Sequence, residues 1–132
     1  MRLIVYCDGG SRGNPGPSAL GVVIKTSKGE IIEEIGEYLG VQTNNFAEYS
    51  AVVRALERLN EMKVLEADFF LDSELIVRQL NGIYKVKNAN IKPLNSRVVE
   101  LCSGMDTTFT HVYRQDNKQA DAVVNDVLDS IK

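Results

Sequence analysis

The sequence predicts a mixed α/β protein in which helices cover both faces of a five-stranded sheet. Two short apolar runs, residues 3–7 and 67–71, are typical of strands that are buried on both faces. The first run is followed by two stretches rich in β-branched residues, and the second by segments with helical spacing. Because crossover connections are right-handed, the first, fourth and fifth strands should be parallel neighbours, and the first three should be antiparallel.

The first half of the chain should form three strands and a long helix. Residues 19–25 and 30–39 are the second and third strands, joined as a hairpin by the turn at 26–29. Residues 44–62 have the period of an amphipathic helix that begins after a Thr or Asn cap. Its polar face carries Ser50, Arg54, Glu57, Arg58 and Glu61. The opposite face of this helix is therefore predicted to lie on the sheet.

The second half should add two strands and three helices. The fourth strand is followed by a helix at 73–80, which ends at an Asn-Gly pair. Pro93 and Gly104 mark the two ends of a third helix. A last strand is predicted at 109–113 and a terminal helix at 118–131. This order of elements places helices on both sides of one mixed sheet.

Length and composition indicate one domain over residues 1–132. The chain is 44% hydrophobic and 25% charged, which is ordinary for one soluble domain with one core. No apolar run approaches the ~20 residues that span a bilayer, and no signal sequence opens the chain. Cys7 and Cys102 lie in apolar runs, which favours buried thiols over a disulfide. We expect a cytoplasmic monomer without membrane contact.

Two acids directly follow apolar strands, where a carboxylate would be presented at the rim of the sheet. Asp8 follows the run 3–7 and precedes a glycine-rich stretch, and Asp72 follows the run 67–71 and precedes Ser73. A turn residue is the alternative interpretation of Asp8, and a helix cap is that of Asp72. Neither alternative explains why both acids stand at the carboxyl ends of adjacent parallel strands, where open α/β sheets place their chemistry.

Glu48 lies on the apolar side of the predicted first helix, in phase with Val52 and Ala55. A glutamate that faces the sheet is costly unless a positive charge compensates it. The alternative is a side chain that reaches solvent at the edge of the helix. Asp121 borders the apolar face of the terminal helix. The acids that can converge at one edge of the sheet are thus Asp8, Glu48, Asp72 and Asp121.

Such a cluster needs cations or protons, because like charges about 4 Å apart repel by ~4 kcal/mol at an effective dielectric constant of about 20. Ligands that are all oxygen select magnesium or manganese. The one histidine, His111, lies inside the predicted last strand and is expected as a strand residue, and no Cys/His spacing suits zinc. With a net charge of −3, a nucleic-acid partner would have to be held by metal ions or by local basic patches.

Four motifs, in this order, resemble those of type I ribonuclease H over nearly the whole chain. They are DGGSRGNPGP at 8–17, TNNFAEYSAVVRAL at 43–56, DSELIVRQLNG at 72–82 and YRQDNKQADAVVN at 113–125. The resemblance implies the ribonuclease H-like fold and hydrolysis of the RNA strand of RNA/DNA hybrids to 5′-phosphate and 3′-hydroxyl ends. It also implies that the four acids are the catalytic carboxylates and bind two divalent ions, Mg²⁺ or alternatively Mn²⁺.

The same resemblance assigns substrate contacts to three parts of the chain. The residues predicted to approach the RNA strand are Gly9, Gly10, Ser11, Arg12, Gly13 and Asn14. Thr43 is predicted to meet a phosphate of the DNA strand, and Asn44 and Asn45 to bind in the minor groove. Ser73, Arg114 and Asn117 complete the set of substrate-binding residues. Glycine would let backbone amides come close to 2′-hydroxyls, whereas ordinary helix-start residues remain the alternative for the two asparagines.

The sequence departs from many family members in two places. The segment before Asp121 has no histidine, and it resembles the archaeal and plant-like subgroup with the pattern R-x-x-N-x-x-A-D. In that pattern Arg114 and Asn117 would orient Asp121 or touch a phosphate. The basic handle between two helices is reduced to GIYKVKNANIKP at 82–93, in which the lysines are Lys85, Lys87 and Lys92. We therefore expect modest substrate affinity that falls strongly with salt.

Three rival functions differ in what they require. A nucleotide-phosphate cradle would need a G-x-x-x-x-G-K-[ST] motif and a helix directly after the loop, and the sequence has neither. A catalytically silent hybrid-binding domain would not need the complete set of four acids. A nuclease that also cleaves double-stranded RNA would carry the same residues, so the sequence leaves this alternative open.

Overall fold

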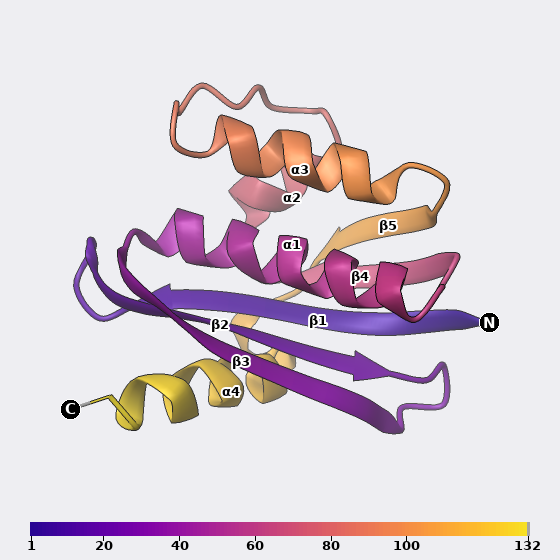
Figure 1. Ribbon diagram of the computed structural model, residues 1–132, viewed down its shortest axis with the longest axis horizontal. Coiled ribbons are helices and arrows are strands. Elements are labelled where there is room, and N and C mark those ends of the chain that lie inside the picture. The colour runs from indigo at the N-terminus through magenta and orange to yellow at the C-terminus, as the bar shows by residue number, and fades with distance from the viewer. Residues whose placement is uncertain (132) are drawn as a thin grey trace.

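A computed structural model describes residues 1–131, which form a five-stranded mixed sheet with helices on both faces (Figure 1). The strands are β1 (Arg2–Ser11), β2 (Gly16–Lys25), β3 (Ile31–Gln42), β4 (Glu66–Leu71) and β5 (Asp106–His111). The helices are α1 (Asn44–Glu61), α2 (Glu74–Leu80), α3 (Lys92–Cys102) and α4 (Lys118–Asp129). A short 3₁₀ turn, Arg114–Asp116, precedes α4.

The sheet order is β3-β2-β1-β4-β5. β1 and β2 are antiparallel, as are β2 and β3, whereas β4 is parallel to both β1 and β5. This arrangement confirms the predicted fold class. It places the carboxyl ends of β1 and β4 side by side, which is the geometry that Asp8 and Asp72 were expected to use.

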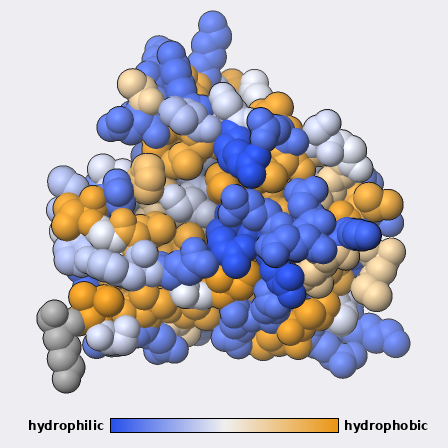
Figure 2. All heavy atoms as spheres, in the orientation of Figure 1, coloured by the Kyte–Doolittle hydropathy of each residue, from blue (hydrophilic) through white to orange (hydrophobic). Residues whose placement is uncertain are grey.

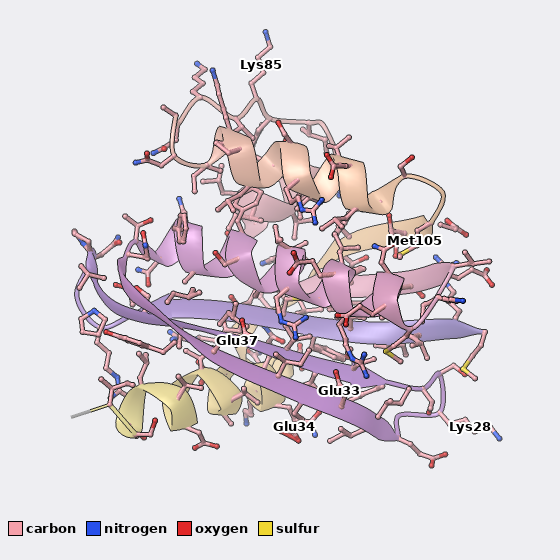
Figure 3. The ribbon with its side chains drawn as sticks, viewed as in Figure 1. Lys28, Glu33, Glu34, Glu37, Lys85 and Met105 are labelled. Carbon is pink, nitrogen blue, oxygen red and sulfur yellow. The ribbon has the colours of Figure 1, made fainter. Side chains whose placement is uncertain are left out.

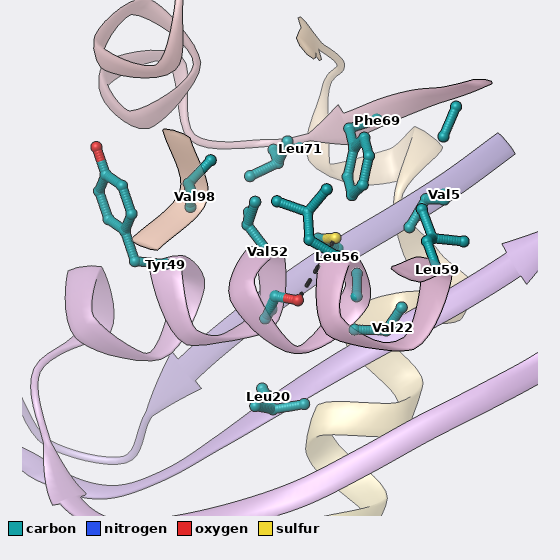
Figure 4. Packing of buried hydrophobic residues seen from close by; sticks show 14 of the residues in the cluster. Val5, Leu20, Val22, Tyr49, Val52, Leu56, Leu59, Phe69, Leu71 and Val98 are labelled. Atoms are coloured by element: carbon teal, nitrogen blue, oxygen red, sulfur yellow. Dashed lines mark hydrogen bonds between the residues drawn. The ribbon is translucent and has the colours of Figure 1, made fainter. Parts of the chain in front are cut away.

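The main core lies between the sheet and α1. Figure 4 shows side chains of α1 packed against those of β1, β2 and β4. Val52, Leu56 and Leu59 are fully buried, as the helical period predicts. On the other face of the sheet α4 packs alone, with Val124 and Leu128 buried beside Ala19 of β2 (Figure 1). α1 and α4 therefore each present one apolar stripe to the sheet.

The outer face of α1 is polar and is tied to the edge strand β3. Arg54 pairs with Glu37 at 2.9 Å, and Arg58 pairs with Glu33 at 2.7 Å. Glu33 and Glu37 lie on the side of β3 that faces α1 (Figure 3). Hydrophilic side chains gather over this part of α1 and β3 (Figure 2). The polar face predicted for this helix is thus confirmed.

Several strand boundaries differ from the prediction. β2 already begins at Gly16, before the predicted start at residue 19, and β3 continues to Gln42, beyond the predicted end at residue 39. β1 does not end before Asp8, because Gly9 and Gly10 continue the ladder opposite Leu20 and Ala19 of β2. The last strand is Asp106–His111 and not 109–113. Its threonines, which are β-branched, pair with β4 from the start, and the chain leaves the sheet at Tyr113 to enter the 3₁₀ turn.

Cys7 and Cys102 are both free thiols, as expected, but only Cys7 is fully buried, whereas Cys102 is half-buried. Burial raises the pKa of both. In the part of the chain that the structure describes, none of the helices has the length and apolar character needed to cross a membrane.

Candidate active site

The four predicted acids line one cavity at the carboxyl ends of β1 and β4. Asp8 comes from β1, Glu48 from the second turn of α1, Asp72 from the end of β4, and Asp121 from the first turn of α4. The cavity has a volume of about 600 Å³. Its wall also contains Gly9, Gly10, Ser11, Arg12, Asn44, Asn45, Arg114, Val124, Asn125 and Leu128. The structure therefore brings together acids that are far apart in the sequence.

Two of these acids hold their protons at neutral pH when no cation is bound. Burial raises the pKa of Asp8 to about 8, helped by the charges of Asp72, Glu48 and Asp121 and by a hydrogen bond with Asp121. Burial and the charge of Asp72 raise the pKa of Glu48 to about 8, although Ser73 and Arg114 oppose this rise. A bound cation would lower both pKa values, so that the two carboxyl groups would lose these protons.

Raising the pH should therefore destabilise the protein in the absence of divalent metal ions. Asp8 and Glu48 have folded-state pKa values of about 8, against ordinary values of 3.8 and 4.5. The folded state binds more protons than the unfolded state between about pH 4 and pH 8, so stability falls across that window. We expect the thermal midpoint, followed by circular dichroism in EDTA, to drop by roughly 5 °C or more from pH 5 to pH 9.

Asp8→Asn should flatten this pH dependence, and Mg²⁺ added at pH 9 should restore much of the lost stability. A thermal midpoint that is the same at pH 5 and pH 9 in EDTA would contradict the proposed protonation of Asp8 and Glu48.

Asp72 is held by Asn117, which is only 1% exposed. The Nδ2 of Asn117 donates to the Cys7 carbonyl oxygen at 2.9 Å and to Asp72 Oδ2 at 3.2 Å. Its Oδ1 is buried and has no hydrogen-bond partner among the described residues. Asn117 was predicted to orient Asp121 or to touch a phosphate. Its side chain joins β1 to Asp72 and not to Asp121, whereas the predicted phosphate contact stays a prediction.

Asp72 is not a helix cap. Ser73 is the N-cap of α2, and its hydroxyl accepts a hydrogen bond from the Ile76 amide at 3.3 Å. The hydroxyl of Ser73, predicted to bind substrate, is therefore already engaged at the start of α2. The Asp72 carboxylate remains directed to the cavity, so the capping explanation of this acid falls away.

Gly9 is required by packing. A Cβ atom at this position would lie 2.2 Å from the backbone carbon of Ala47, which directly precedes Glu48. A Cβ at Gly10 would meet only Val124, at 3.5 Å. Gly9 was predicted to let the backbone approach RNA, but its missing side chain is explained by the close approach of α1. Gly10 has no such structural explanation, and it lines the cavity.

The loop after β1 is fastened to the start of α1. The Ser11 amide donates to Asn44 Oδ1 at 2.8 Å, and the Asn44 amide donates to Asn14 Oδ1 at 3.1 Å. Thr43 is the N-cap of α1, since its hydroxyl accepts from the Phe46 amide at 3.2 Å. Asn44 is thus more than a helix-start residue, because its side chain fixes the loop beside the acids.

A second groove, of about 670 Å³, begins at Asn45 and runs past Thr43 and Asn14. Its other wall is the segment before α3, which includes Asn88 and Asn90. Sequence reasoning did not single out these two asparagines. Both belong to the reduced basic segment at 82–93, whose Lys85 points away from the body of the protein (Figure 3). The groove and the acidic cavity share Asn45.

The donors in the cavity suit a hard divalent cation. The side chains that could act as ligands are carboxylates, and His111 ends β5 outside the described cavity wall, with its ring edge against Tyr113. Within residues 1–131, no three of these acids already form a closed set of metal ligands. A bound cation would have to draw its carboxylate ligands together.

The sheet order and this cavity define an α/β protein with a carboxylate centre at the edge of its sheet. A family profile described as "Reverse transcriptase-like" matches residues 6–127. The Ribonuclease HI of Halobacterium salinarum is 40% identical over 97% of this chain and 65% of its own length. The Ribonuclease H of Syntrophus aciditrophicus is 31% identical over 92% of this chain and 78% of its own length. The chain therefore belongs to the ribonuclease H family.

Solved structures agree with this assignment. The RNase H1 of Halobacterium salinarum superposes with a TM-score of 0.94, at 39% identity, over 98% of each chain. LC11-RNase H1 in complex with an RNA/DNA hybrid gives a TM-score of 0.92, at 41% identity, over 96% of each chain. Some curated relatives are longer, since the chain spans 65% of the Halobacterium protein and 36% of a bifunctional protein of Mycobacterium tuberculosis.

Proposed function

We propose that this chain is a metal-dependent endoribonuclease that hydrolyses the RNA strand of RNA/DNA hybrids and leaves 5′-phosphate and 3′-hydroxyl ends. The observation that carries the proposal is the single cavity in which Asp8, Glu48, Asp72 and Asp121 meet, beside the loop after β1. Membership of the ribonuclease H family supports the activity, and so does the hybrid bound to LC11-RNase H1.

The proposed cofactor is Mg²⁺, with two ions per site and with Mn²⁺ as an alternative of the same ligand preference. Ions bound there would supply the Lewis acidity that activates a water molecule and stabilises the leaving 3′ oxygen. All four acids would hold the ions, and no covalent nucleophile is needed from the protein. This assignment rests on the all-oxygen donors of the cavity wall.

The chain's own residues prepare the site in two ways. Asn117 fixes one oxygen of Asp72 through a partly buried hydrogen bond of 3.2 Å, so this carboxylate is oriented before substrate arrives. Arg114 lines the same cavity, and its positive charge favours the ionised form of Glu48 by lowering the pKa of this carboxyl group. Its guanidinium is the kind of donor that binds a phosphate oxygen, which gives Arg114 a role where other family members carry a histidine.

Selectivity would come from how the duplex is placed, because metal ions hydrolyse any phosphodiester that reaches them in the right geometry. The loop from Gly10 to Asn14, together with Asn44 and Asn45, would contact successive 2′-hydroxyls of an RNA strand in a wide minor groove. The position of Gly10, Ser11 and Arg12 in the cavity wall supports this proposal. Thr43 lines the second groove, which would hold a phosphate of the DNA strand. Lys85, Lys87 and Lys92 would add salt-sensitive contacts to the nucleic-acid backbone.

A cleavage panel of RNA/DNA, RNA/RNA and DNA/DNA duplexes with Mg²⁺ or Mn²⁺ tests this proposal. We expect the hybrid to be cut fastest, double-stranded RNA more slowly and DNA duplexes not at all, since DNA lacks the 2′-hydroxyls. A run of four ribonucleotides within DNA should be cut inside the run. Hybrid affinity should fall steeply as salt rises.

The same panel separates the rival functions. Binding of the hybrid without cleavage in either metal would indicate a silent hybrid-binding domain. Equal rates on RNA/RNA and RNA/DNA would remove the proposed role of Thr43 in selecting a DNA strand. Comparable cutting of DNA/DNA at matched salt would refute recognition through 2′-hydroxyls.

A further inference from the structure

Asn125 lines the cavity, and neither the sequence analysis nor the proposed function gives its side chain a role. It lies one helical turn after Asp121 on α4, and its Nδ2 donates to the Asp121 carbonyl oxygen at 3.1 Å and to Asp121 Oδ2 at 3.2 Å. The Asp121 side chain also shares a hydrogen bond with the carboxyl group of Asp8. The Asp121 carboxylate is thus held between a neutral amide and another acid.

The other end of the Asn125 amide faces the loop after β1. Its Oδ1 accepts a long hydrogen bond of 3.5 Å from Arg12 Nη2, and the same nitrogen pairs with Asp129 at 2.6 Å. If the amide were rotated by half a turn, its NH₂ group would face a guanidinium, and its oxygen would face a carboxylate and a carbonyl. Both contacts would be unfavourable. Arg12 therefore fixes which end of the amide reaches Asp121.

A neutral amide suits this place better than a charged side chain. A lysine or arginine would neutralise Asp121 and would compete with a bound cation for its oxygens. An aspartate would add a further like charge to a cavity that already holds four acids. An amide orients one oxygen of Asp121 by a hydrogen bond and leaves the charge of the carboxylate available.

We propose that Asn125 is a positioning residue that holds Asp121 in the orientation needed to bind a divalent cation, with Arg12 setting the direction of its amide. This inference rests on the proposed function, because that function gives Asp121 its role as a ligand. Groups that orient a metal ligand typically contribute 10–100-fold to metal affinity or activity. The exposure of Asn125 places the expected effect near the lower end of that range.

The test measures Mn²⁺ binding to the substrate-free protein by calorimetry, and then kcat and KM on a hybrid. Asn125→Ala should weaken Mn²⁺ binding by about 10-fold and lower kcat by a similar factor, with little change in KM. Asn125→Gln keeps both ends of the amide and should recover most of this loss. Gln119→Ala removes an exposed amide from the same helix outside the described cavity wall, and it should change neither quantity.

A thermodynamic cycle makes the outcome specific. In an Asp121→Asn background, Asn125→Ala should cause no further loss of Mn²⁺ affinity, because the group that it orients is already gone. Unchanged Mn²⁺ affinity in Asn125→Ala, or a rise confined to KM, would overturn the positioning role, and the KM result would indicate a substrate contact. If wild type binds Mn²⁺ but cuts no hybrid, the proposed function fails, while the affinity cycle still decides the role of Asn125.

Discussion

Asp72→Asn is expected to lower hybrid cleavage by more than about 100-fold, the upper end of the loss seen for groups that only orient a metal ligand. The substitution keeps the size of the side chain and removes its charge. The asparagine oxygen can still accept the hydrogen bond from Asn117, which measures 3.2 Å in the wild type. The protein should therefore stay folded, and it should be slightly more stable in EDTA because one source of repulsion for Asp8 and Glu48 is gone.

The measurements are single-turnover cleavage of a hybrid in Mg²⁺ and thermal unfolding in EDTA. A matched pair on α1 provides the control. Glu48 faces the cavity, so Glu48→Gln should lose activity as Asp72→Asn does. Glu57 lies on the polar face of the same helix, so Glu57→Gln should change neither the cleavage rate nor the stability. A rate for Asp72→Asn within tenfold of wild type would remove this residue from the catalytic centre.

The sequence was sufficient to predict the sheet and the four acids, because both depend on local pattern. Helical phase placed Glu48 on the sheet side of α1, opposite Arg54 and Arg58, and the structure has this arrangement. Strand ends placed Asp8 and Asp72 at adjacent positions of one sheet edge. The failure at β5 is also local, since threonine was given too little weight as a strand former at the start of that element.

The roles of the supporting residues could not be predicted, because these roles depend on contacts between distant segments. Asn117 touches Cys7, which lies 110 positions earlier in the chain, and Arg12 touches Asn125, 113 positions later. No period or motif spacing reports such contacts. Asn125 stood inside a quoted motif, but its spacing of four residues from Asp121 was the only available signal, and that spacing is common to any two neighbours on a helix.

Gly9→Ala is expected to destabilise the protein strongly, although it adds only one methyl group. The added Cβ would lie 2.2 Å from the Ala47 carbon and 2.3 Å from the Glu48 nitrogen. Both are backbone atoms, so α1 as a whole would have to move away from β1. Overpacking usually costs 1–3 kcal/mol, and a clash with a helix backbone should cost about 3 kcal/mol or more. That is a large fraction of a typical stability of 5–15 kcal/mol.

Gly10→Ala is the matched variant, since it adds the same methyl group one residue later. Its Cβ would stand at an ordinary 3.5 Å from Val124, so stability measured by urea unfolding should change by less than about 0.5 kcal/mol. That methyl group would line the cavity where the backbone is proposed to meet the RNA strand, and KM for a hybrid should therefore rise. Gly9→Ala, if it folds, should instead lose kcat, because Glu48 moves with α1. Equal stability of the two variants would show that the close approach of α1 to β1 does not require glycine, and an unchanged KM in Gly10→Ala would show that the RNA does not pass close to this part of the loop.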